Sequence, residues 1–213
     1  MIYDIVVVGG GHAGCEAASS AAKMGSSVLL VTMNLQTIAQ MSCNPAMGGV
    51  AKGQILREID ALGGLSGIIT DRTAIQFRML NRSKGPAMWS PRVQSDRMRF
   101  AEEWRLSLEQ IPNLDFLQAS VEGVDVTNKK ISGVFLNNGT RIACKTVVLT
   151  SGTFLNGVMH IGENKTHGGR SSESSSKGIT RCLELLGFES GRMKTGTPPR
   201  LDGRSLNYSA FEE

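Results

Sequence analysis

The chain has 213 residues, 40% of them hydrophobic and 20% charged, as in an ordinary soluble globular protein. No apolar run approaches the ~18 residues that a membrane-spanning helix needs, and the start lacks the basic region of a signal peptide, so we expect a cytoplasmic protein without membrane contact. Four cysteines, Cys15, Cys43, Cys144 and Cys182, form no CxxC or other metal spacing, which predicts reduced thiols and no metal site.

The net charge of +4 is concentrated in one segment. Between Asp71 and Arg105, eight basic residues oppose four acidic ones, which leaves 23 − 8 = 15 basic and 19 − 4 = 15 acidic residues elsewhere. Such a local surplus suits a polyanionic partner such as a nucleic acid, and a solvated helical face is the alternative.

The first predicted elements form a βαβ unit. Tyr3–Val8 is an apolar run rich in β-branched residues, typical of a buried strand. Residues 15–24 predict a helix with small side chains that can lie close to a sheet, and Gly25 can end it. Residues 27–31 predict the next strand, and the crossover of such a unit is almost always right-handed.

Two helices and a third strand follow, and then the pattern changes. Helical spacing predicts helices over 53–62, stopped by Gly63, and over 97–108, and Leu114–Gln118 reads as a buried strand. Short apolar segments at 121–126, 131–136 and 140–144 are separated by turns, one of them Asn138–Gly139, a strong hairpin signal. They predict a three-stranded antiparallel meander, after which residues 147–150 return as a buried strand.

This order predicts an α/β fold: a Rossmann-like FAD-binding domain of the glutathione-reductase type, with a parallel sheet and a meander as crossover. Plain NAD domains more often cross with a helix. After Gly152 the signal thins: residues 171–176 are serine-rich and predict a mobile loop, 178–187 a helix, and 192–204 a loop.

The first turn carries a phosphate-binding motif. Gly9, Gly11 and Gly14 fit G-x-G-x-x-G between a strand and a helix, where they permit a tight turn, a close approach of pyrophosphate and close helix packing. We expect His12 to contribute only its backbone. The acid that should follow about 20 residues later, on the ribose hydroxyls, is missing, and Asn34 can bond the ribose instead. The missing acid weakens the prediction of NAD and the prediction of FAD alike, and the meander favours FAD.

Residues 42–53, SCNPAMGGVAKG, join a cysteine to a proline-stiffened, glycine-rich segment that leads into a helix. A helix N-terminus beside a flavin pyrimidine ring would stabilise the anionic reduced flavin. A cysteine beside such a terminus is of the reactive type, so Cys43 is a candidate catalytic thiol; an inert loop cysteine is the alternative.

This segment and several others resemble the MnmG (formerly GidA) family. The matching stretches are MSCNPAMGGVAKG, GGGHAG, DALGG, IQFRMLNRSKGPA, VVLTSGTFLNG and GRMKTGTPPR, and the similarity runs from Tyr3 to about Ser209. The family is the flavoprotein subunit of the enzyme that installs 5-carboxymethylaminomethyl groups on the wobble uridine of tRNA. It also has Thr-x-Asn at the end of the second strand, which accounts for the missing acid.

The resemblance implies an enzyme that binds FAD and uses NADH to reduce it. It takes a one-carbon unit from methylenetetrahydrofolate and joins it, with glycine or ammonium, to C5 of uridine 34 of tRNA. It works with an MnmE-type GTPase and forms a homodimer. Family members continue well beyond this length, so the resemblance implies an N-terminal part: residues 1–190 as FAD-binding domain and 191–213 as the connection toward an inserted second domain.

Position by position, the resemblance assigns the pyrophosphate to the glycine turn and the adenine end to the backbone of Val121. Ser176 matches a further flavin contact, although its serine-rich surroundings depart from the family, and Gly152 closes the last buried strand at the same site. Cys43 matches a cysteine hypothesised to attack C6 of uridine. The cofactor-binding residues predicted are Gly9, Gly10, Gly11, His12, Ala13, Gly14, Asn34, Val121, Gly152 and Ser176.

Two basic segments are candidates for substrate. Arg78, Arg82 and Lys84 could contact tRNA phosphates or folate, with an exposed loop as the alternative. Lys194 and Arg200 could present cations to folate carboxylates or RNA phosphates, with a structural corner as the alternative.

Three other functions remain open. One is the related folate- and FAD-dependent tRNA uridine methyltransferase, against which the cysteine segment argues. Another is a simple NAD-dependent dehydrogenase domain, against which the meander and the missing ribose acid argue. The third is a non-catalytic, flavin-loaded scaffold that docks on RNA or a partner.

Overall fold

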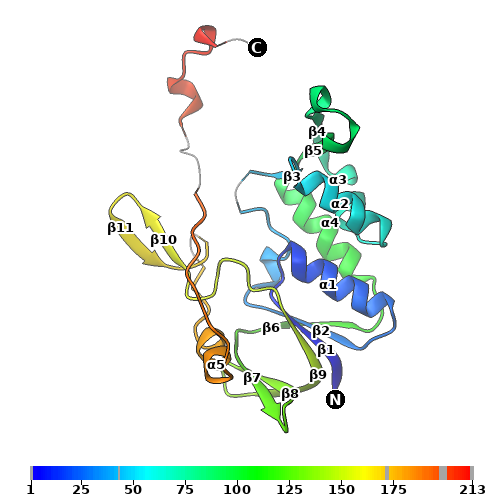
Figure 1. Ribbon diagram of the computed structural model, residues 1–213, viewed down its shortest axis with the longest axis vertical. Helices are drawn as coiled ribbons and strands as arrows, with labels where there is room; N and C mark the ends of the chain where they lie inside the picture. The colour runs from blue at the N-terminus through cyan, green and yellow to red at the C-terminus, as the bar shows by residue number, and fades with distance from the viewer. Residues whose placement is uncertain (1, 43, 171–172, 197–200, 212–213) are drawn as a thin grey trace.

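A computed structural model describes residues 2–42, 44–170, 173–196 and 201–211. Its centre is a six-stranded sheet in the order β6-β2-β1-β9-β8-β7, in which β1 pairs in parallel with both β2 and β9 (Figure 1). The strands are β1 (Tyr3–Val8), β2 (Val28–Thr32), β6 (Leu114–Gln118), β7 (Val121–Thr127), β8 (Lys130–Leu136) and β9 (Arg141–Leu149). The predicted α/β fold with a parallel sheet and a meander crossover is confirmed.

Two helices cover one face of this sheet. The helix α1 (His12–Lys23) buries its small residues, Cys15 and Ala18 among them, against the strands. In α4 (Arg97–Glu109), Phe100, Trp104 and Leu108 recur every fourth position and are fully buried in the same cluster. Asp96 caps α4 by accepting hydrogen bonds from two backbone N–H groups, as an N-cap side chain does. The glycine turn before α1 is thereby carried on a rigid layer.

The other face of the sheet packs against the meander and a late helix. Val6, Val31 and Val134 share a second buried cluster with Ile179 of α5 (Ile179–Leu185), the helix predicted over 178–187. Positive φ angles at Asn128 and Lys129 turn β7 into β8, and the Asn–Gly turn leads from β8 to β9 as predicted. The cleft is therefore backed by packed cores on both faces of the sheet.

One predicted boundary is wrong. Residues 140–144 and 147–150 were expected as separate strands, but β9 is continuous. Its first half pairs antiparallel with β8, with Gly133 opposite Ala143, and its second half pairs in parallel with β1, with Val6 opposite Val147. Lys145 and Thr146 between the halves carry no turn chemistry, so nothing interrupts the strand.

A second lobe was not predicted as such. It holds an antiparallel sheet in the order β3-β5-β4 with two helices beside it (Figure 1). Part of the predicted cysteine loop forms β3, and part of the basic segment expected as a loop forms β4, so the loop alternative fails there. The elements are β3 (Ala46–Gly48), α2 (Lys52–Ala61), α3 (Ser66–Arg72), β4 (Ala74–Leu80), η2 (Arg82–Lys84), η3 (Pro86–Met88) and β5 (Ser90–Ser95).

The remaining chain forms a small hairpin and an extended tail. The hairpin joins β10 (Val158–Ile161) to β11 (Asn164–His167) and was missed from the sequence. Residues 192–196 and 201–202 are irregular, as predicted, and short turns η4 (Gly203–Ser205) and η5 (Tyr208–Ala210) follow. None of the helices in the described ranges is long and apolar enough to cross a bilayer.

Candidate cofactor cleft

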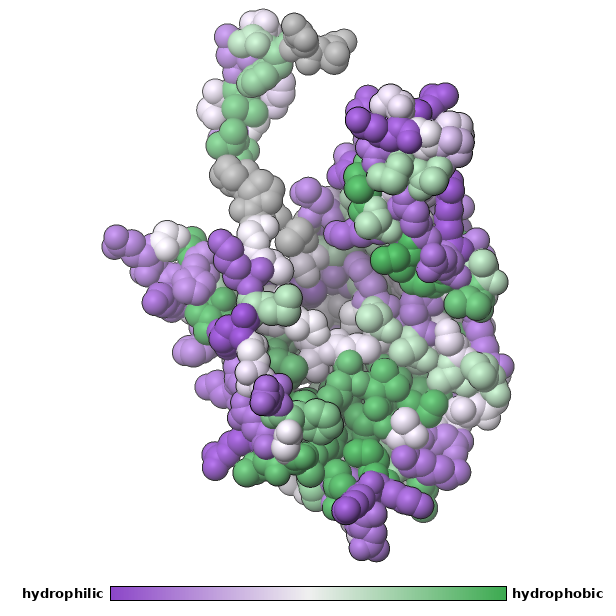
Figure 2. Space-filling model, in the orientation of Figure 1, coloured by the Kyte–Doolittle hydropathy of each residue, from purple (hydrophilic) through white to green (hydrophobic). Residues whose placement is uncertain are grey.

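A cleft of about 550 Å³ opens at the carboxyl ends of β1, β2 and β9. This is the edge of a parallel sheet at which nucleotides bind, and the volume lies within the roughly 300–1,000 Å³ of ligand pockets. Around the cleft the surface is mixed: hydrophobic side chains gather below it over the six-stranded sheet, and hydrophilic ones gather at the tip of the second lobe (Figure 2). Position and size make this cleft the candidate site.

The three motif glycines have different surroundings. Gly9 has a φ of +111°, and a Cβ there would lie 2.6 Å from the carbonyl oxygen of Thr150. A Cβ at Gly14 would lie 1.8 Å from the carbonyl oxygen of Gly9, so only glycine lets α1 approach the turn. At Gly11, by contrast, a Cβ would meet no atom of the described residues within 4 Å. The turn is thus closed on its protein side and open toward the cleft.

The open side of the turn suits an anion. Gly11 is the N-cap of α1, no side chain of the described residues caps this end, and the first turn contains no acidic residue. Its first N–H groups and the positive end of the helix dipole are therefore available to a phosphate. On the closed side, Thr150 Oγ1 donates to the carbonyls of Val8 (2.9 Å) and Gly9 (3.0 Å), which ties the turn to the end of β9.

The side chain of His12 has a protein partner of its own. Its Nε2 lies 2.9 Å from the carbonyl oxygen of Ala39, and its ring meets Phe100 edge-on at 5.5 Å. A carbonyl can only accept, so Nε2 carries the hydrogen. Burial lowers the pKa of His12 from 6.5, which keeps the ring neutral. From the sequence only the backbone of His12 was expected to matter. In the structure the His12 ring also anchors the 34–41 segment to the turn.

Cys15 is a packing residue within the small-residue helix α1. Its Sγ lies 3.5 Å from the carbonyl oxygen of Gly10, and burial raises the pKa of the thiol to about 12. A thiol with that pKa is uncharged at neutral pH and unreactive.

The far end of the cleft follows β2. Asn34 Oδ1 accepts from the backbone N–H of Gln36 at 2.9 Å and so caps η1 (Leu35–Thr37), which leaves the amide NH₂ as a donor. Val121, at the start of β7, also lines this end. No acid stands at the end of β2, and the one carboxylate that lines the cleft in the described ranges is that of Glu173, 139 residues after Asn34.

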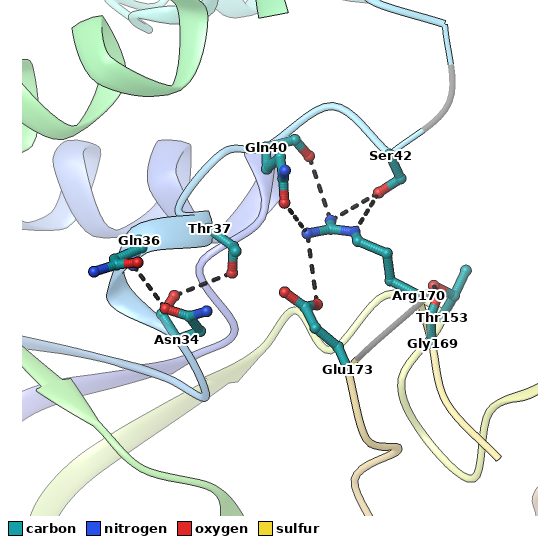
Figure 3. A network of polar contacts seen from close by, with 9 residues as sticks. All are labelled: Asn34, Gln36, Thr37, Gln40, Ser42, Thr153, Gly169, Arg170 and Glu173. Carbon is teal, nitrogen blue, oxygen red and sulfur yellow. Dashed lines mark hydrogen bonds and ion pairs between the residues drawn. The ribbon is translucent and has the colours of Figure 1, made fainter. Parts of the chain in front are cut away.

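A network around Arg170 joins two segments across the mouth of the cleft (Figure 3). The guanidinium donates to Ser42 Oγ and to both the side chain and backbone of Gln40, and it pairs with Glu173 at 3.5 Å. Sequence reasoning missed Arg170 and Glu173, and only the neighbouring Gly168 and Gly169 hinted at an ordered turn there.

The serine-rich stretch expected as a mobile loop is anchored at its end. Ser176 is 8% exposed, its N–H donates to the Phe154 carbonyl, and its carbonyl accepts from Asn156 N–H, each at 2.9 Å. Ser176 and Gly152 both line the cleft.

The structure brings most of the predicted cofactor residues together. Eight of the ten line the cleft, and Ala13 and Gly14 lie behind it in α1. Cys43 and Arg200 fall outside the described residues, but Ser42, directly before Cys43, lines the cleft. Lys194 is exposed on the tail and does not reach the cleft.

The predicted basic residues lie on the second lobe. Arg78 of β4 stands directly opposite Arg92 of β5, which in turn pairs with Gly48 of β3. Within the described ranges the side chain of neither arginine has a hydrogen bond or ion pair. Arg82 and Lys84 lie in η2, and the Arg82 carbonyl accepts from Trp89 Nε1 at 3.1 Å. Sequence reasoning counted Arg92 but did not place it beside Arg78.

A family model described as "Glucose inhibited division protein A" matches residues 4–213. The chain belongs to this GidA family. The GidA structure from Aquifex aeolicus, in its form II crystal, superposes with a TM-score of 0.94 at 48% identity over 99% of this chain and 35% of that one. A GidA-related protein from Thermus thermophilus shares the fold, with a TM-score of 0.64 at 23% identity over 89% of this chain and 70% of that one.

Curated members of the GidA family carry a function in their names. The tRNA uridine 5-carboxymethylaminomethyl modification enzymes MnmG of Cytophaga hutchinsonii and Flavobacterium johnsoniae are each 69% identical over 211 residues. These residues are 99% of this chain and 34% of each relative. The chain therefore spans about a third of the length of the curated relatives that it matches.

Proposed function

We propose that this chain is the FAD-binding part of a tRNA-modifying enzyme that adds an aminomethyl or carboxymethylaminomethyl group at C5 of the wobble uridine. The observation that carries the FAD site is a contrast within one turn. A Cβ at Gly9 or Gly14 would collide with the protein, whereas a Cβ at Gly11 would enter the open cleft. The names of the curated relatives support the reaction, and they favour it over a uridine methyltransferase.

The residues of the cleft fit FAD from one end to the other. The turn from Gly9 to Gly14 and the uncapped N-terminus of α1 hold the pyrophosphate. Asn34 and the backbone of Val121 hold the ribose and adenine, and Gly152 and Ser176, which also line the cleft, are proposed as further cofactor contacts. When bound, FAD supplies a redox centre that NADH reduces. The His12 ring and Thr150 keep the turn in place for it.

The second lobe is proposed as the tRNA surface. Like charges directly opposite on neighbouring strands are destabilising. Arg78 and Arg92, whose side chains have no partner among the described residues, are therefore better explained by an anionic partner than by the fold. Arg82 and Lys84 extend the charge to the lobe tip, and the partly exposed Trp89 offers a face on which a base can stack. Lys194 and Arg200 are proposed for folate carboxylates or RNA phosphates.

The remaining parts of the function concern the whole protein. Cys43 is proposed as the nucleophile toward uridine C6, because Ser42, its neighbour, lies at the cleft. Methylenetetrahydrofolate as one-carbon donor, NADH, glycine or ammonium, an MnmE-type GTPase partner, a homodimer and a cytoplasmic location complete the proposal. Residues 1–190 form its FAD-binding domain, and 191–213 lead toward an inserted domain.

The decisive experiment uses the full-length protein. Purified protein should carry FAD, identified after release by chromatography and mass, and with the GTPase partner it should produce modified wobble uridine in tRNA. For the RNA surface, Arg78→Gln with Arg92→Gln should reduce the slope of log K against log salt by about 0.7–0.9 for each lost phosphate contact.

Lys145→Gln is the matched control for charge, since Lys145 pairs with Asp4 at 2.6 Å on β9, away from the second lobe. An unchanged slope in the double arginine variant would remove the RNA surface from the proposal. Purification without any flavin, and no gain of flavin on adding FAD, would refute the cofactor.

A further inference from the structure

We propose that Arg170 is a positioning residue that ties the two walls of the cleft mouth together and thereby sets where residues 40–42 lie. Its consequence for cofactor binding rests on the proposed function, since the cleft is taken as the FAD site. Nothing in the family name or the relatives' names assigns this role to it.

The N–H groups of the Arg170 guanidinium donate to one segment, residues 40–42. Nε and Nη2 donate to Ser42 Oγ at 3.0 and 2.7 Å, Nη1 donates to Gln40 Oε1 at 2.7 Å, and Nη2 donates to the Gln40 carbonyl at 3.4 Å. These partners are 128–130 residues away in sequence. The planar guanidinium presents donors from three nitrogens in a fixed fork, which reaches Gln40 and Ser42 side by side (Figure 3). The ammonium of lysine has one nitrogen on a flexible stem and lacks this geometry.

The other side of the clamp holds Arg170 in place. Glu173 Oε2 lies 3.5 Å from Nη1, and the ring of Phe154 lies 5.8 Å from the guanidinium carbon. The side chains of Arg170 and Glu173 are only 21% and 19% exposed. A pair this shielded is held more firmly than a surface ion pair. Arg170 is therefore fixed on its own wall of the cleft, which includes Phe154 and Glu173, and from there it reaches across to residues 40 and 42.

The segment that it reaches has few other anchors at its end. Ala39 is fixed by its N–H, which donates to the Gly10 carbonyl at 2.8 Å, and Met41 is buried in the core. Beyond Met41, both hydrogen bonds of the Ser42 hydroxyl in the described chain come from Arg170. Losing Arg170 should therefore loosen the Ser42 end of the 35–42 segment while leaving the glycine turn in place.

The rival role for Arg170 is a direct charge on the cofactor phosphates. Its donors already have protein partners, and Glu173 offsets its charge, which favours positioning. Arg170→Lys separates the two roles: lysine keeps the charge and loses the fork. A positioning residue fails on this change, whereas a point charge tolerates it.

The test uses the full-length protein and two measurements, amide hydrogen exchange and FAD affinity by titration of the apoprotein. In Arg170→Lys, exchange over residues 35–42 should rise about tenfold and the Kd for FAD about tenfold, as expected for lost charge-assisted hydrogen bonds. Exchange in β1 and α1 should stay unchanged. Ser42→Ala should move both quantities in the same direction by less, since the Gln40 bonds remain.

The matched control is Arg141→Lys, because Arg141 also bridges strands, donating to Asp125 at 2.5 Å and to the Ser132 carbonyl at 2.9 Å, away from the cleft. Unchanged exchange over 35–42 in Arg170→Lys would overturn the proposal, and so would a rise spread over the whole chain. If the wild-type protein binds no FAD, the proposed function fails, and the exchange over 35–42 still decides the clamp.

Discussion

Two alanine substitutions in one turn separate cofactor binding from folding. A Cβ at Gly11 would meet no atom within 4 Å in the part of the chain that the structure describes, and the φ of −77° and ψ of −177° there suit any residue. A Cβ at Gly14 would lie 1.8 Å from the Gly9 carbonyl oxygen, where 3.0 Å is the shortest approach that real Cβ atoms show. In Gly14→Ala, α1 and the turn must therefore separate by 3.0 − 1.8 = 1.2 Å or more.

The expected magnitudes differ accordingly. For Gly11→Ala, the poorer N-cap should lower the free energy of unfolding by about 0.5–1 kcal/mol. The less flexible unfolded chain should raise it by about 0.4–1 kcal/mol, so the net change should be small. Its methyl group enters the space that a pyrophosphate needs, and losing one or two charge-assisted hydrogen bonds, about 3 kcal/mol together, raises the Kd for FAD about a hundredfold. Gly14→Ala should lower the free energy of unfolding by about 1–3 kcal/mol.

Urea unfolding of the apoprotein and fluorescence titration with FAD measure the two effects. Gly191→Ala is the control, because a Cβ there is also unobstructed and lies away from the cleft. Wild-type FAD affinity in Gly11→Ala would refute the reasoning, since the pyrophosphate would then lie elsewhere. A loss of stability in Gly11→Ala as large as in Gly14→Ala would also refute it, because the turn would not be open.

Two further predictions concern the frame that holds the turn. Burial lowers the pKa of His12 below 6.5, so the unfolded chain takes up this proton first, and stability should fall as the pH drops from about 6.5 toward the lowered pKa. His12→Gln keeps a donor for Ala39 and should flatten unfolding free energy against pH in that window; an equally steep curve would contradict this. Glu16 accepts from the N–H groups of Leu65 (3.1 Å) and Ser66 (2.6 Å). Glu16→Ala should therefore lower the free energy of unfolding in urea by about 2 kcal/mol, and Glu16→Gln should lower it by less. Equal losses in the two variants would show that the charge is irrelevant.

The local parts of the site were readable from sequence because their chemistry is local. A buried strand, three spaced glycines and a small-residue helix define the turn within a few positions of one another. The Asn–Gly turn likewise indicated the hairpin from β8 to β9. The break expected within β9 was wrong because apolar content dips at Lys145 without any turn residue, and pairing with β1 and β8 carries the strand through.

The second lobe shows where a signal was present but outweighed. In β4, apolar Ile75, Phe77 and Met79 alternate with polar Gln76 and Arg78, the period of a strand. Because of the charge surplus, the same residues were interpreted as a basic loop. Ile75 and Phe77 are 70% and 59% exposed, so the apolar side of this edge strand is not the core face that such alternation normally marks.

The clamp at Arg170 could not be predicted from sequence for a different reason. Its partners Gln40 and Ser42 lie 130 and 128 residues away, and no periodicity or spacing says which loops of a fold meet. The sheet order brings them together: β9 lies beside β1, so the chain leaving β9 returns over the same edge as the chain that follows β2. The phosphate turn is thus built almost entirely by residues that are close in sequence. The walls around it come from distant segments joined by one guanidinium. Mutations in the turn should therefore act directly on binding or folding, whereas mutations in the clamp should act on binding through the shape of the cleft.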